Sequence, residues 1–139
     1  MPYSPLARGV LTGKYHPDMA PPPETRAGRQ DRRMLESEWR PESVAIAQEI
    51  AAHARSRGIT AGRFAFAWVL NNRMVTAAID GPRTEEQWDD YAGALAYRFT
   101  SEDEALVDRL ITTGHASSPR YNDPAYPIEG RIPRSAATA

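Results

Sequence analysis

Two short loops carry residues whose types and spacing suit the binding of a phosphate group. The first is YSPLARGVLTGK, where Ser4 offers a hydroxyl, Leu6 a backbone N–H, and Arg8 and Lys14 cationic side chains. Its two glycines allow the backbone to approach a ligand closely. The loop therefore predicts an anion site, although an ordinary loop with Pro, Gly and solvated cations fits the same letters.

The second loop is IDGPRTEEQW, in which Gly81 opens a turn, Arg83 follows, and a helix is expected to begin at Thr84. A helix N-terminus with a nearby arginine suits a phosphate, and an arginine beside a ribose can select a 2′-phosphate. A simpler interpretation also stands, because Thr84 and Gln87 have the spacing of a capping box that needs no ligand.

Helices and strands must position these loops. Apolar residues at helical spacing predict helices over 42–57 and 61–71, another from residue 84 and a fourth over 102–112. The short apolar run 74–79 predicts a buried strand before the second loop, and the first loop follows the end of another strand.

Local signals mark where these helices begin. Pro41 suits a first helical position, Thr60 can cap the second helix, and Ser101 with Glu104 has capping-box spacing. Trp88 and Leu95 fall on one face of the third helix, so we expect Trp88 to be buried.

Polar segments surround these elements. Residues 16–40 are polar, contain several prolines and have no period, which predicts a long surface loop. We expect residues 1–114 to form one structural part and residues 115–139 an extended or disordered tail.

Strands that alternate with helices indicate an α/β fold with a parallel sheet. Two strands are too few for such a sheet, because a parallel pair needs neighbours on both sides. The pattern therefore predicts one end of a larger α/β fold.

Composition excludes several classes of function. The chain has 139 residues, a net charge of −1, no cysteine and three histidines, no two of them at helical metal-ligand spacing. These values favour neither nucleic acid nor a membrane surface as a partner, and they predict no metal site. No long apolar run or secretory signal is visible, so we expect a cytoplasmic protein.

Together the two loops resemble the aldo/keto reductase family, which has an eight-stranded (β/α)8 barrel and uses NADPH. PYSPLARGVLTGKY looks like the segment that leaves the family's seventh strand, and AAIDGPRTEEQWDDYAGAL looks like the eighth strand with its following helix. The resemblance covers residues 2–112. It implies the C-terminal portion of a barrel, with about two strands and four helices.

The resemblance implies a role for each matching position of the first loop. The aromatic residue that matches Tyr3 stacks on the nicotinamide in the family. Positions that match Ser4, Leu6 and often Lys14 lie along the pyrophosphate.

In the second loop, positions that match Arg83 and Gln87 hold the 2′-phosphate and ribose end, and the acidic position that matches Asp90 meets the adenine. Two departures weaken the match. Tyr91 replaces a common asparagine, and the anionic Asp80 replaces a common proline.

The family's catalytic Asp, Tyr, Lys and His lie on earlier strands, and no residue here matches them. The resemblance therefore implies the cofactor-binding C-terminal part of an NADPH-dependent reductase of aldehydes or ketones, inactive by itself. Two alternatives to this interpretation remain open. One is a non-catalytic NADPH-binding module, like the family's channel-associated β subunits. The other is an inert truncation that self-associates through open sheet edges.

Overall fold

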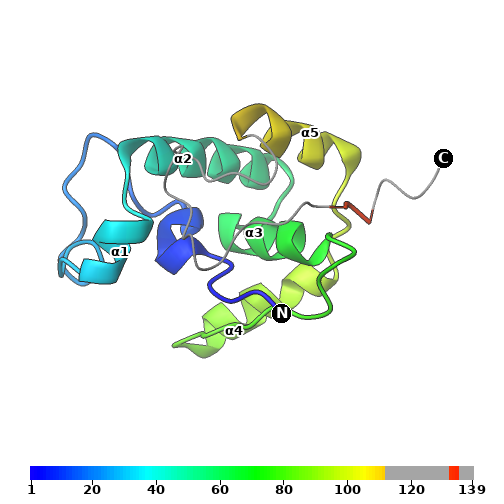
Figure 1. Ribbon diagram of the computed structural model, residues 1–139, viewed down its shortest axis with the longest axis horizontal. Coiled ribbons are helices and arrows are strands. Elements are labelled where there is room, and N and C mark those ends of the chain that lie inside the picture. The colour runs from blue at the N-terminus through cyan, green and yellow to red at the C-terminus, as the bar shows by residue number, and fades with distance from the viewer. Residues whose placement is uncertain (112–131, 135–139) are drawn as a thin grey trace.

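The computed structural model describes residues 1–111 and 132–134, which form a set of short helices (Figure 1). The elements are η1 (Ala7–Thr12), α1 (Arg32–Ser37), α2 (Pro41–Ser56), α3 (Ala61–Leu70), α4 (Glu85–Ala92), η2 (Gly93–Leu95) and α5 (Ser101–Leu110). In Figure 1, α2 and α5 lie on one side of α3 and α4 lies on the other.

The predicted α/β fold with two barrel strands is wrong for the described residues, which contain no sheet. Where the two strands were expected, a single parallel bridge joins Tyr3 and Ile79, with a 2.9 Å bond from the Ile79 N–H to the Pro2 carbonyl. The physical reason is that a strand is held by hydrogen bonds to neighbouring strands. The apolar run 74–79 has a single bridge where a buried parallel strand needs a neighbour on both sides.

The predicted helices are confirmed within a few residues, because their starts are encoded locally. Pro41 begins α2, Thr60 accepts a bond from the Arg63 N–H at 3.0 Å, and Thr84 accepts one from the Gln87 N–H at 3.2 Å. Each cap satisfies a backbone donor that the first turn leaves without a partner.

Two details at helix starts differ from the prediction. The expected 16–40 loop contains α1, which Asp31 caps by accepting from the Met34 N–H at 2.9 Å. The capping box of α5 is one residue earlier than predicted and uses Thr100 and Asp103. The shift arises because Asp103 points inward, where its carboxylate serves several donors at once.

The core lies between α2, α3 and α5, with Phe64 of α3 at its centre. Phe64 is 1% exposed, and its ring centroid lies 4.8 Å from that of Phe99. The expectation that Trp88 is buried is wrong, since it is 56% exposed. Tyr91 instead turns inward from α4 and stacks on Phe66.

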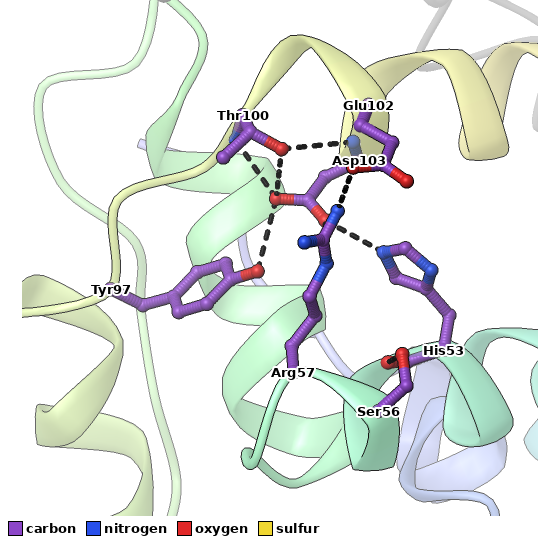
Figure 2. A network of polar contacts seen from close by, with 7 residues as sticks. All are labelled: His53, Ser56, Arg57, Tyr97, Thr100, Glu102 and Asp103. Carbon is purple, nitrogen blue, oxygen red and sulfur yellow. Dashed lines mark hydrogen bonds and ion pairs between the residues drawn. The ribbon is translucent and has the colours of Figure 1, made fainter.

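A buried carboxylate ties α5 to α2 (Figure 2). The Asp103 side chain is fully buried and lies 2.7 Å from His53 Nε2 of α2. It also accepts bonds from the Tyr97 hydroxyl at 3.0 Å and from the N–H and hydroxyl of Thr100 at 2.8 and 2.9 Å. Arg57 closes the network by pairing with both Glu102 and Asp103.

These contacts determine the ionisation of the network. Burial alone raises the pKa of Asp103, but the bonds from His53, Thr100 and Tyr97 outweigh it and hold that pKa below its ordinary value of 3.8. Burial, and then the bond donated to Asp103, raises the pKa of Tyr97 to about 12. Asp103 is therefore the anionic centre of the network, and Tyr97 stays protonated.

Residues 132–134 return to the end of α3. Pro133 forms an antiparallel bridge with Asn72, and the Arg134 guanidinium donates to the carbonyls of Leu70 and Val75 at 3.1 and 2.9 Å. The expected extended or disordered tail otherwise lies outside the described residues.

Candidate functional site: an anion-binding cavity between two loops

The two loops singled out in the sequence face the same cavity, of about 360 Å³. Of the predicted cofactor residues, all but one line it, and these are Tyr3, Ser4, Leu6, Lys14, Gly81, Arg83 and Gln87. Two stretches far apart in sequence, 3–14 and 81–87, therefore lie around one space. The Tyr3–Ile79 bridge explains this, because it fixes the starts of both loops next to each other.

The first loop has a strained backbone. Ser4, Ala7 and Arg8 have φ values of 54°, 46° and 52°, in the left-handed region that side-chain-bearing residues rarely occupy. Each such residue costs about 1–2 kcal/mol, and strain of this kind gathers at ligand sites. The loop turns this sharply because the Ala7 N–H bonds to the Ser4 carbonyl at 2.9 Å and the Gly9 N–H to the Leu6 carbonyl at 2.8 Å.

Gly9 leaves room for the side chain of Lys14. Its φ is 97°, and a Cβ at this position would lie 3.1 Å from Lys14 Nζ. Lys14 Nζ also lies 5.2 Å from the ring centroid of Tyr15, which is a cation–π distance. The glycine and the tyrosine together direct an exposed ammonium group along the cavity.

The second loop presents Arg83 beside the start of α4. The Arg83 backbone N–H donates to Gln87 Oε1 at 2.8 Å, and the Thr84 hydroxyl caps the helix. The simpler interpretation from the sequence is thus confirmed for the Thr84 cap. The cap does not involve the Arg83 guanidinium, which is exposed at the cavity and makes no hydrogen bond or ion pair to the described residues.

Among the described residues that line the cavity, Asp80 is the only one with a carboxylate. Its Oδ1 accepts a bond from the Gly81 N–H at 2.6 Å, and burial raises its pKa. Arg8, Lys14, Arg26 and Arg83 line the same space, so the cavity carries a net positive charge. Such a cavity suits a ligand with more than one anionic group.

Asp90, predicted to meet the adenine, does not line the cavity. Its carboxylate accepts a 2.6 Å bond from the Thr60 hydroxyl and pairs with Arg63 at 3.3 Å, so it joins α4 to α3. As it stands in this structure, Asp90 serves packing between these helices.

Sequence reasoning missed Arg26, which lines the cavity from the long loop before α1. Its neighbours Thr25 and Ala27 are both buried, at 8% and 4% exposure, so the chain projects Arg26 outward between two anchors. Asp31 holds the guanidinium at 3.3 Å. The only signal in the sequence was the length of this loop with its prolines, since ordered loops of such length usually have a function.

We expect Gly28→Ala to disrupt the loop that carries Arg26. A Cβ at Gly28 would clash with the Pro22 carbonyl oxygen, a backbone atom that cannot easily move away. Overpacking of this kind costs about 1–3 kcal/mol of unfolding free energy, measured by urea denaturation. Gly58→Ala, which meets nothing within 4 Å but has a φ of 72°, is the comparison for backbone strain alone. Equal losses in the two variants would contradict the close contact.

Comparison with known proteins identifies the family. The aldo/keto reductase family model matches residues 1–112, so the chain belongs to the aldo/keto reductase family. This is a family of oxidoreductases that use a nicotinamide cofactor.

Similar proteins include L-glyceraldehyde 3-phosphate reductase of Escherichia coli O157:H7, 29% identical over 119 residues, which are 81% of this chain and 33% of that protein. The probable aldo-keto reductase 1 of Glycine max is 26% identical over 121 residues, 87% of this chain and 34% of the relative. Aldo-keto reductase str7 of Strobilurus tenacellus is 27% identical over 109 residues, covering 78% and 32%. The chain spans about a third of the length of these relatives.

Two other kinds of feature are absent from the residues that the structure describes. None of their helices has both the length and the apolar character that crossing a membrane requires. Nor does this part of the chain bring together three or more His, Cys, Asp or Glu side chains that could hold a metal ion.

Proposed function

We propose that this chain is the cofactor-binding part of an NADPH-dependent reductase of aldehydes or ketones. The observation that carries the proposal is the cavity between the two loops, which gathers Lys14, Arg26 and Arg83 around one space. A dinucleotide with a diphosphate and a 2′-phosphate supplies anionic groups for several cations at once. Family membership supports a nicotinamide cofactor, and the charge of the cavity favours the phosphorylated form, NADPH.

In this proposal each loop holds one end of the cofactor. The first loop, with Ser4, Leu6 and Lys14, lies along the diphosphate, and Tyr3 stacks on the nicotinamide. The second loop, with Gly81, Arg83 and Gln87, holds the 2′-phosphate. Tyr3 is 58% exposed, so its ring is accessible to a planar ligand.

A binding measurement tests the proposal. NADPH titrated into the 139-residue chain should bind saturably by calorimetry, and Lys14→Ala should weaken the affinity roughly 10-fold by removing a charged contact. Arg55→Ala is the matched control, because Arg55 is exposed on α2 outside the cavity. Absence of saturable binding, or equal losses in the two variants, would count against the proposal.

We expect the chain alone not to reduce carbonyl compounds. A reductase of this family needs a proton donor for the carbonyl oxygen, and no residue here matches the family's catalytic positions. Oxidation of NADPH by a test aldehyde, followed at 340 nm, should equal the rate without protein. Turnover that disappears in a Ser4→Ala variant would contradict this expectation.

A further inference from the structure

A second cavity, of about 230 Å³, lies on the other side of η1 from the cofactor cavity. Ala7, Val10 and Leu11 of η1 line this second cavity, whereas Arg8 and Gly9 of the same element line the first. In Figure 1, η1 (dark blue) packs against α2 and α3. One short, strained element is therefore the shared wall of two cavities.

The second cavity is mainly apolar with a polar portion. Its apolar lining beyond η1 includes Ile46, Ile50, Phe64, Trp68, Val107 and Ile111. The polar residues come from one stretch of chain, Glu38, Arg40 and Ser43. A cavity of roughly 150 Å³ already admits benzene, so a single ring with a short substituent fits here.

The polar portion indicates the kind of substituent that would suit the cavity. Glu38 is a hydrogen-bond acceptor and Arg40 a donor, and a hydroxyl can donate to the first and accept from the second. A charged substituent would meet one of these two residues with the wrong sign. A neutral aromatic alcohol thus matches both the walls and the polar portion.

We propose that this apolar cavity binds a small aromatic alcohol and that its occupancy strengthens cofactor binding on the other side of η1. The coupling rests on the proposed function, whereas the alcohol site does not. The link is an ion pair between the cavities, in which Arg8 Nε lies 3.9 Å from Glu38 Oε1. Arg8 lines the cofactor cavity and Glu38 lines the alcohol cavity.

The ion pair gives the coupling its direction. At 3.9 Å the contact between Arg8 and Glu38 is too long for a hydrogen bond. An alcohol that donates to Glu38 offers this carboxylate a closer partner and leaves Arg8 available to the anionic cofactor. By linkage, cofactor binding must strengthen alcohol binding by the same factor.

The site itself is tested with benzyl alcohol and the 139-residue chain, by ligand-observed NMR titration over the millimolar range. We expect saturable binding that Ile46→Trp abolishes by filling the cavity and that Ile46→Ala retains. Ala45→Trp, at an exposed position beside it on α2, is the matched control and should also retain binding. Absence of saturable binding by the unaltered chain, or binding that survives in Ile46→Trp, overturns the site.

The coupling is tested by titrating NADPH with and without saturating benzyl alcohol. We expect the NADPH dissociation constant to fall about fivefold with the alcohol, at the lower end of ordinary couplings. Glu38→Gln should tighten NADPH binding without alcohol and remove the further gain. An unchanged dissociation constant overturns the coupling and leaves the alcohol site standing. If the chain bound no NADPH, the cofactor function and the coupling would both fail, while the alcohol titration would still decide the site.

Discussion

Asp103→Ala should lower the free energy of unfolding by about 3 kcal/mol, because it leaves several partly buried donors without their acceptor. The lost contacts are those to His53 of α2 and to Tyr97 and Thr100 in the segment just before α5. Urea denaturation measures the change. Asp89→Ala removes an exposed carboxylate from α4 and should cost less than about 0.5 kcal/mol. A loss below about 1 kcal/mol for Asp103→Ala would contradict a structural role for the network.

The same carboxylate makes stability depend on pH in a defined direction. The pKa of Asp103 is lower in the folded chain than its ordinary value of 3.8. Its contribution is therefore fully present above that ordinary value and is lost as the pH falls through the lowered folded pKa. Asp103→Asn should flatten the decline of stability in this acidic range. An identical pH profile for the two proteins would show that other groups control acid unfolding.

The sequence predicted the features that depend on neighbours along the chain. Pro41, Thr60 and Thr84 mark helix starts where they were expected, because a proline in the first turn and a side-chain cap both act through residues next to them in sequence. The run 74–79 has the composition of a buried strand, but a strand depends on partners distant in sequence, and a single bridge forms there. The composition of residues 74–79 therefore favoured a strand, but the strand did not form because its neighbouring strands are missing from the described residues.

The same distinction applies to the candidate site: the sequence predicted residues on short local loops and missed those that only the fold positions. Spacing placed Ser4, Lys14 and Arg83 on short loops, and these residues do line one cavity. Arg26 could not be found in this way, since it reaches the cavity through a loop whose path depends on Thr25 and Asp31. The role of Asp103 could not be predicted from the sequence either. It lies in an acidic stretch typical of a solvated helix start, and only the fold buries it.

Arg83→Ala should weaken NADPH binding roughly 10- to 100-fold and leave NADH binding nearly unchanged. The exposed guanidinium at the cavity is positioned for a charged group, and charge-assisted hydrogen bonds contribute about 1.5–3 kcal/mol. NADH lacks the 2′-phosphate, so it has nothing to lose when this side chain is removed. The ratio of the two dissociation constants, measured by calorimetry at one salt concentration, reports the effect directly.

Two comparisons separate this role from others. Lys14→Ala should weaken NADPH and NADH alike, because both cofactors carry the diphosphate that we place beside the first loop. Arg83→Lys should recover part of the NADPH affinity through charge but not all of it, because an ammonium lacks the planar fork that binds phosphate in two places. Equal losses of both cofactors in Arg83→Ala would move Arg83 from the 2′-phosphate to the diphosphate. The proposed orientation of the cofactor between the loops would then have to be reversed.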